Sequence, residues 1–138
     1  MSVFTFFCRG HPNITALHPS TIEFTSDTHM TEKGDCIIGV ESSGNLFVLP
    51  TELKDKLRKR GSKITVQIET GDMIEQIKGE GSPDLELSDK NAIIIRKSTF
   101  TDPKTLMIKA DKSAKDLSRE IIENMKDGNS SLKITIQI

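Results

Sequence analysis

Strict alternation of apolar and polar side chains at the C-terminal end of the chain constrains the fold most. From residue 132 to residue 138, four Leu or Ile residues alternate with a lysine, a threonine and a glutamine. A period of two places the apolar side chains on one face of a β-strand. Residues 64–69 show the same pattern, and Gly71 and Asp72 then predict a hairpin that returns over residues 73–78. We therefore expect half-buried antiparallel sheet.

Six further strands are predicted from short runs rich in β-branched and aromatic residues. They cover residues 3–8, 14–17, 21–25, 36–40, 84–87 and 92–97. Three consecutive isoleucines at 93–95 are typical of a strand covered on both faces.

Apolar residues three to four positions apart predict two helices, over residues 51–60 and 112–126. Both apolar stripes are narrow, so each helix is expected to lie on a sheet with its other side in water. The predicted fold class is α+β. We expect a single domain over residues 1–138, with a mostly antiparallel sheet of about seven to nine short strands and two helices.

Charge and composition narrow the functional class. The 138 residues include 19 Lys and Arg against 20 Asp and Glu, so the formal net charge is −1. Such a chain lacks the positive field that holds proteins to nucleic acids or anionic membranes by charge alone. No apolar run approaches the roughly 20 residues that span a bilayer, and two cysteines make no disulfide framework. These features favour a soluble cytoplasmic protein with no membrane association.

All three histidines lie within 19 residues of one another near the N-terminus. Imidazole and carboxylate are ligands for divalent metals, so His11 and His18 are candidate metal ligands for a divalent metal cofactor. Their seven-residue spacing matches no standard metal motif, which favours loop histidines bonded to the backbone. As catalytic candidates, His11 or His18 would act as general base. Asp35 or Glu23 would then orient the imidazole ring.

A group of basic and hydroxyl side chains follows the triple-isoleucine strand. Arg96, Lys97 and Ser98 are candidates for holding a phosphate or carboxylate group. The alternative is an ordinary strand end that turns back into water. Three residues nearer the N-terminus complete the candidate ligand-binding set, namely Arg9, Asn13 and Glu23.

Two further features have structural explanations. Cys36 shares strand parity with Ile38 and Val40, so we expect it to be a small buried hydrophobe and not a nucleophile. Residues 54–63 hold six basic side chains and one acid, which is typical of a nucleic-acid contact. Cations near a helix C-terminus also interact favourably with the helix dipole. The scarcity of aromatic residues for base stacking favours this second explanation.

Five short strings, taken in order, resemble an uncharacterised archaeal family, a domain of unknown function (family 371). They are RGHPN at 9–13, TIEFT at 21–25, GDCIIGV at 34–40, GEGSP at 79–83 and RKS at 96–98. The resemblance spans nearly the whole chain. It implies an archaeal cytoplasmic protein of one domain, and it supplies no activity.

Three functional hypotheses follow. The leading one is a small-ligand-binding or enzymatic site for a small anionic ligand, with Arg9, His11, His18, Asp35 and Arg96 converging on one cleft. In that cleft, Asp35 would accept a hydrogen bond from an arginine or a histidine. The second hypothesis is a non-enzymatic interaction module, associated with RNA or a ribonucleoprotein, that uses the basic stretch at residues 54–63. The third is a homo-oligomeric structural domain whose motifs only shape loops.

Overall fold

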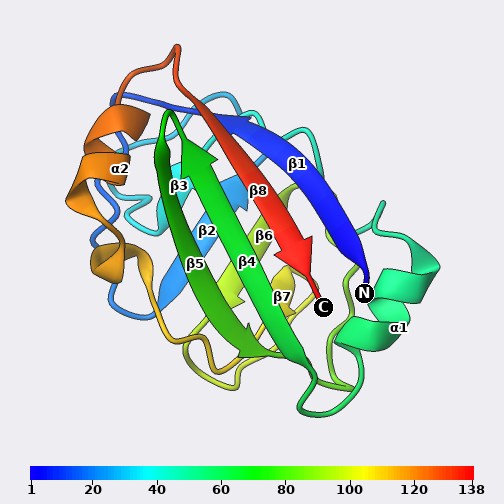
Figure 1. The fold of residues 1–138 in the computed structure, drawn as a ribbon. Coiled ribbons are helices and arrows are strands. Elements are labelled where there is room, and N and C mark those ends of the chain that lie inside the picture. Colours follow the sequence, from blue (N-terminus) through cyan, green and yellow to red (C-terminus); the bar gives the residue numbers. More distant parts are fainter.

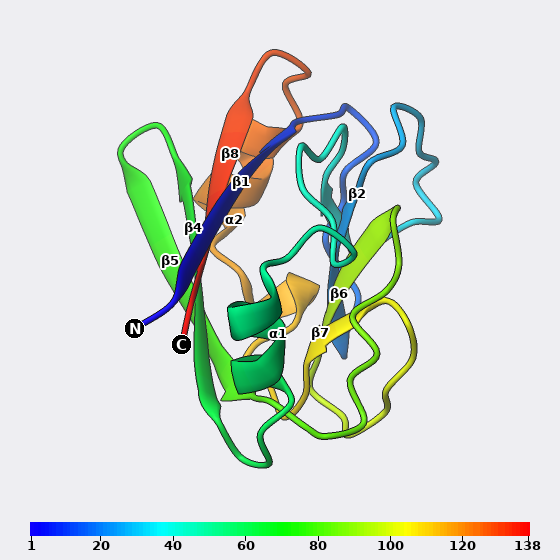
Figure 2. The same ribbon diagram turned by 90° about the vertical axis from the view of Figure 1, so that its right-hand side faces the viewer.

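Two four-stranded sheets face each other in the computed structural model, which describes residues 1–138 (Figure 2). Sheet A has the strand order β1-β8-β4-β5, and sheet B has the order β3-β2-β6-β7. The strands of sheet A are β1 (Val3–Arg9), β4 (Lys63–Thr70), β5 (Met73–Glu80) and β8 (Ser131–Gln137). Those of sheet B are β2 (Thr21–Thr25), β3 (Ile37–Gly39), β6 (Ala92–Arg96) and β7 (Thr105–Met107).

Sheet A is antiparallel throughout, as its alternating sequences predict. In β8 the side chains of Leu132, Ile134 and Ile136 are buried against the second sheet. The predicted hairpin joins β4 to β5, with Thr70 opposite Met73. In sheet B, β2 and β6 are antiparallel, whereas β2 with β3 and β6 with β7 are parallel pairs. Four of the six strand pairs are thus antiparallel, which confirms the predicted α+β class.

Single backbone bridges join the two sheets at both margins. Arg9 at the end of β1 pairs with Val40 just after β3, and Glu80 of β5 pairs with Ile108 just after β7. These bridges close the two sheets into a flattened barrel, which leaves few unpaired strand edges. The two α-helices, α1 (Thr51–Leu57) and α2 (Arg119–Met125), lie on opposite sides of the sandwich (Figure 1). Neither helix is long and apolar enough to cross a membrane.

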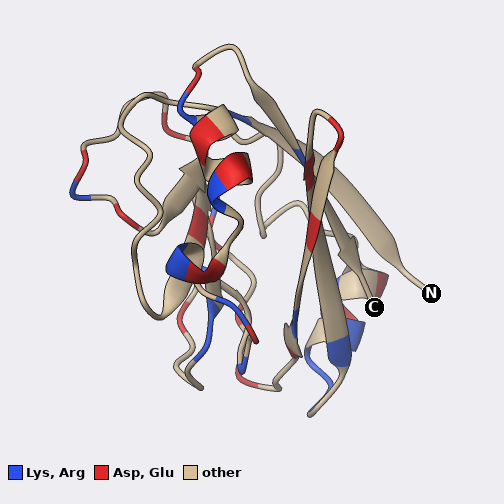
Figure 3. Ribbon diagram, turned by 60° about the vertical axis from the view of Figure 1, so that its left-hand side comes forward, with Lys and Arg blue, Asp and Glu red and all other residues tan.

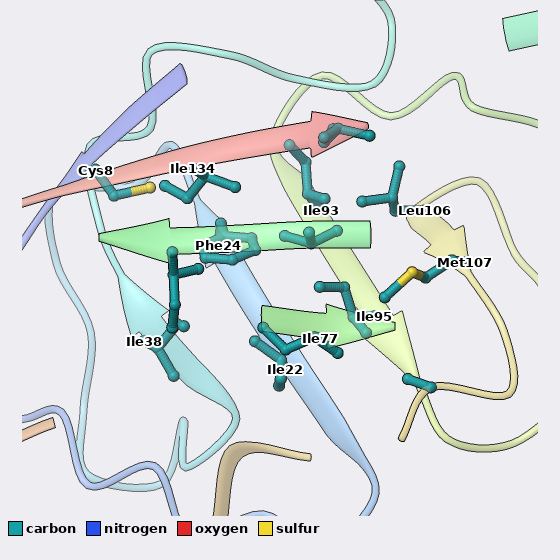
Figure 4. Packing of buried hydrophobic residues seen from close by; sticks show 14 of the residues in the cluster. Cys8, Ile22, Phe24, Ile38, Ile77, Ile93, Ile95, Leu106, Met107 and Ile134 are labelled. Atoms are coloured by element: carbon teal, nitrogen blue, oxygen red, sulfur yellow. The ribbon is translucent and has the colours of Figure 1, made fainter. Parts of the chain in front are cut away.

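The core between the sheets is a cluster of 30 buried residues (Figure 4). Phe24 of β2 is fully buried and meets the ring of Phe6 edge-on, with 5.6 Å between the ring centroids. Burying one such aromatic side chain contributes about 1.5–3 kcal/mol to the free energy of unfolding. This core fixes which faces of β2 and β6 point outward.

Two of the predicted strands are wrong, because each contains a residue with left-handed backbone. Residues 14–17 and 84–87 form no strand, although Ile14 and Leu85 are buried. Ala16 has φ 51° and Leu87 has φ 52°. A positive φ interrupts the extended backbone that a β-ladder requires. The sequence also did not predict β7, a three-residue strand next to β6.

Both predicted helices are shorter in the structure. Helix α1 ends at Leu57, before Gly61 with φ 71°. The second helix is divided into a 3₁₀ turn, η1 (Ala114–Asp116), and α2. The division lies at Leu117, whose backbone is extended with ψ 151°. Ser113 and Asp116 form a capping box, in which the Ser113 amide donates to the Asp116 carboxylate over 2.9 Å.

Candidate functional site

The outer face of sheet B carries a group of polar side chains that points away from the core. In β2, Ile22 and Phe24 point inward and are fully buried. The alternate residues Thr21 and Glu23 therefore share the outer face with their neighbours on β6, since Thr21 lies opposite Arg96. We call the group the outer-face cluster and define it as His18, Thr21, Glu23, Cys36, Arg96, Asp102 and Thr105.

Arg96 is held rigidly in this cluster. Its Nε donates to Oγ1 of Thr105 over 2.8 Å, and its Nη2 donates to Oδ2 of Asp102 over 2.9 Å. Its Cζ lies 4.9 Å from the centre of the Phe100 ring. The side chain is only 13% exposed, yet its Nη1 makes no hydrogen bond to protein. The Nη1 edge of this positioned guanidinium group is thus left to donate to another acceptor.

The Asp102 carboxylate is strongly hydrogen-bonded. Partial burial favours a higher pKa, but hydrogen bonds from the Thr105 hydroxyl and the Lys104 amide, with the charge of Arg96, lower the pKa of Asp102 below its usual value. Asp102 is therefore an anion that partly neutralises Arg96. Neither Asp102 nor Thr105 was predicted as a site residue. The Asp102-Pro103 pair is a turn signal that points to this local geometry.

Glu23 lacks a charged partner at close range. Oε1 of Glu23 accepts a hydrogen bond from the Cys36 thiol over 3.5 Å, and no cation lies within 4.0 Å of the carboxylate. Burial raises the pKa of Glu23 above its ordinary value, while Cys36, Lys104 and Arg96 act in the opposite direction. A thiol is a weak hydrogen-bond donor, so this half-buried carboxylate is poorly compensated.

Cys36 is not the buried core residue that strand parity predicts. Glu23 pairs with Ile37, and Phe24 pairs with Gly39, so the β2–β3 register is irregular at this point. Cys36 itself lies in the turn before β3, where strand parity does not set the direction of the side chain. The Cys36 thiol therefore lies half-buried beside Glu23. Burial and the negative charge of Glu23 raise the pKa of Cys36 to about 12, which keeps the thiol protonated.

His18 is oriented by backbone amides and joins the cluster through Thr21. Its Nδ1 accepts hydrogen bonds from the amides of Ser20 and Thr21 over 3.1 and 3.2 Å, and lies 3.1 Å from the Thr21 hydroxyl. Because amides can only donate, the neutral ring is assigned the tautomer with hydrogen on Nε2. In this tautomer the only ring lone pair is already engaged. The ring is then suited to donate a hydrogen bond from Nε2.

Arg9, His11 and Asn13 lie in a separate region, beside the C-terminal end of α2. The His11 amide donates to the Met125 carbonyl, and Nδ1 of His11 accepts from the Asn13 amide. The Asn13 side chain donates to the Met30 carbonyl over 2.9 Å. No hydrogen bond joins these side chains to the outer-face cluster.

The prediction that the Asp35 carboxylate accepts a hydrogen bond from an arginine or a histidine is wrong. The Asp35 carbonyl accepts from the amides of Leu17 and His18, but its carboxylate makes no hydrogen bond or ion pair. Arg96, at the end of β6, pairs instead with Asp102 in the loop between β6 and β7.

The two residues after Arg96 are engaged elsewhere. The Lys97 ammonium donates to Asp116 over 3.0 Å, and the Ser98 hydroxyl accepts from the Phe100 amide. Both side chains are therefore already bonded within the protein, whereas Nη1 of Arg96 has no partner.

The five residues expected in one cleft do not share one. The hollow present in the molecule has a volume of about 220 Å³ and lies between the N-terminus and α1, lined by Met1, Ser2, Val3, Pro50, Glu52 and Leu53. None of the predicted site residues lines it. No three His, Cys, Asp or Glu side chains are grouped so that they could hold a metal ion.

The basic stretch at residues 54–63 makes mostly internal contacts. Arg58 donates to the carbonyls of Leu85 and Glu86, and Lys56 pairs with Glu52 on the same helix. Lys63 lies 3.5 Å from Glu80. Along the ribbon, basic and acidic residues are interspersed (Figure 3). These contacts favour the structural explanation of the stretch.

Comparison with known proteins supplies the family. The profile of a family described as "Domain of unknown function (DUF371)" matches residues 6–138. The chain belongs to this family. An uncharacterized protein of Methanocaldococcus jannaschii is 42% identical to the chain over 125 residues, which covers 91% of this chain and 92% of that protein. The resemblance inferred from the short sequence strings is thereby confirmed, and the function of the DUF371 domain is unknown.

Proposed function

We propose that the outer-face cluster binds a small ligand that carries an anionic group, and that Arg96 is its main receptor. The observation that carries this proposal is the unpartnered Nη1 of an arginine whose other donors are already fixed. A guanidinium group held in one orientation loses little side-chain entropy when it binds, and its planar fork matches carboxylate and phosphate oxygens.

One further group of the cluster and two residues beside it support the same role. Nε2 of His18 is free to donate a hydrogen bond, and the Lys104 ammonium makes no ion pair. The Phe100 side chain is 60% exposed and lies over the Arg96 guanidinium. Such a ring shields the arginine from water and strengthens its interaction with an anion. The proposed roles are anion receptor for Arg96 and hydrogen-bond donor for His18.

We also propose that the protein is cytoplasmic. Its two cysteines are both free, and Cys36 is half-buried and not disulfide-bonded. Free thiols are typical of proteins in reducing compartments.

The test is an NMR titration of the ¹⁵N-labelled protein with propionate and with inorganic phosphate. We expect saturable shifts of the amides in β2, in β6 and around residue 102 with at least one anion. The variant Arg96→Gln should weaken this binding at least tenfold. Arg58→Gln is the matched control, because Arg58 also donates through Nε and Nη2 and should leave binding unchanged.

Two results would overturn the proposal. One is the absence of saturable shifts at the cluster with both anions. The other is equal binding by the wild type and Arg96→Gln. If Arg96→Gln does not fold, Arg96→Lys is used instead, since it keeps the charge but loses the planar fork. Equal binding by the folded lysine variant would count against a positioned guanidinium receptor.

A further inference from the structure

We propose that the ligand of the outer-face cluster is a small zwitterion, whose carboxylate binds Arg96 and whose protonated amine binds Glu23. This inference rests on the proposed function, and it names the ligand class of the same site. An α-amino acid is the simplest member of this class, because it carries both charges on one carbon.

The register of β2 and β6 places the two receptors at a suitable separation. Thr21 lies opposite Arg96, and Glu23 lies opposite Ile94, so Glu23 and Arg96 are diagonal neighbours on one face. Diagonal residues in an antiparallel pair lie roughly 7–8 Å apart at their Cα atoms. Arg96 is bonded on the β7 side of this pair and Glu23 on the β3 side, so a ligand that contacts both side chains has to lie across β2 and β6.

Glu23 needs the cation that such a ligand supplies. It is half-buried, its hydrogen-bond donor is a thiol, and it forms no ion pair. A desolvated carboxylate of this kind is stabilised by an ammonium group that donates a hydrogen bond to it. Arg96 does not meet this need, because its Nη2 is bound to Asp102.

Further acidic side chains lie near Glu23 and Cys36. Asp27 follows β2 on the Glu23 side and raises the pKa of Glu23, and Asp35 acts in the same sense on Cys36. Lys104 opposes them but lies more than 4.0 Å from the Glu23 carboxylate. His18 adds a donor on the Arg96 side through its contact with Thr21. A dianion would meet the Glu23 and Asp27 carboxylates, whereas a zwitterion matches both ends.

An apolar side chain lies between the two receptors. Ile94 is half-buried, directly opposite Glu23 and two residues before Arg96 on the same face. It offers an apolar floor for the carbon atoms of the ligand. We therefore infer an amino acid with a short apolar side chain.

Three probes of matched size test the inference. L-alanine carries both charges, propionate lacks the amine, and ethylamine lacks the carboxylate. Titrations followed by NMR should give a dissociation constant for L-alanine at least tenfold lower than those for propionate and ethylamine. Glu23→Gln should abolish most of this tenfold advantage while leaving propionate binding unchanged or improved.

Glu75→Gln is the matched control. Glu75 is also a half-buried carboxylate on a strand, β5, but it already pairs with Lys112 over 3.2 Å. Its substitution should not change the preference for L-alanine over propionate.

The outcomes separate the two proposals. If propionate binds at Arg96 as tightly as L-alanine, the zwitterion inference is overturned and the anion site stands. If L-alanine is preferred equally by the wild type and Glu23→Gln, the assignment of the amine to Glu23 is overturned. If neither propionate nor phosphate nor L-alanine binds at the cluster, the proposed function and the inference both fail. The wild-type comparison needs no variant, so it remains decisive if Glu23→Gln does not fold.

Discussion

The Cys36 thiol donates to the Glu23 carboxylate over 3.5 Å, on the side of sheet B that faces away from the core. Cys36 lies in the turn before β3, and its carbonyl accepts from the Glu23 amide over 2.8 Å, which brings the two side chains together. The Glu23 carboxylate raises the pKa of the Cys36 thiol, whereas the hydrogen bond from Cys36 lowers the pKa of Glu23, which burial raises. This explains why the cluster presents a protonated thiol and a poorly compensated carboxyl group.

Glu23→Gln is expected to make Cys36 more reactive toward alkylating reagents. Burial, followed by the charge and hydrogen bonding of Glu23, raises the pKa of Cys36 to about 12. The thiolate is the reactive form, so each unit by which the pKa falls raises its fraction at neutral pH about tenfold. The measurement is the rate of iodoacetamide modification against pH, with the modified residue located by mass spectrometry. Cys8 is buried and should remain unmodified in the folded protein. Identical pH profiles for the wild type and the variant would contradict the proposed electrostatic contact.

Asp102→Asn is expected to lower the free energy of unfolding by about 1–2 kcal/mol at pH 7. The ion pair with Arg96 is partly buried, so its loss should fall between the values for exposed and buried pairs. The pKa of Asp102 is lowered in the folded protein from 3.8, so this stabilisation is present above pH 3.8 and is lost as the pH falls below it. Urea denaturation at pH 7 and pH 3 should show a smaller difference between wild type and variant at the lower pH.

The matched control for Asp102 is Glu52→Gln. Glu52 pairs with Lys56 over 3.6 Å, but its side chain is 78% exposed. We expect this substitution to change the free energy of unfolding by less than about 0.5 kcal/mol. An effect as large as that of Asp102→Asn would show that burial is not what distinguishes the two pairs.

Gly10→Ala is expected to destabilise the protein by about 2 kcal/mol or more. A Cβ atom at this position would collide with the carbonyl oxygens of Asp127 and Met125. Both are backbone atoms that cannot rotate away, so the loop after α2 would have to move. The control is Gly128→Ala, where the nearest such atom is 4.0 Å away. Thermal and urea denaturation should separate the two variants, and equal stabilities would contradict the close approach at Gly10.

The family motifs in the N-terminal part of the chain have different roles in the structure. In RGHPN, Gly10 allows close approach of two carbonyls, and His11 and Asn13 shape the loop beside α2. In TIEFT and GDCIIGV, by contrast, Thr21, Glu23 and Cys36 meet on one face. Sequence proximity suggested one site for both groups. The separation arises because the chain crosses from one sheet to the other between residues 9 and 21.

The sequence by itself determined the strands whose pattern reflects burial on one face. Strands β4 and β8 alternate strictly, and a shift of one residue would expose every buried isoleucine, so their positions follow from the hydrophobic effect. It also determined the family and the near-neutral charge.

Only the tertiary structure decided where the polar side chains go. Ala16 and Leu87 have left-handed backbone within two predicted strands, and neither is a glycine, asparagine or aspartate, the residues that signal such a conformation. Cys36 lies in the turn before β3 and contacts Glu23, and Asp102 rather than Asp35 became the partner of Arg96. These outcomes depend on strand pairing and loop closure between distant segments. The periodicity of a single strand contains no information about which partner it meets, so this part of the site had to come from the fold.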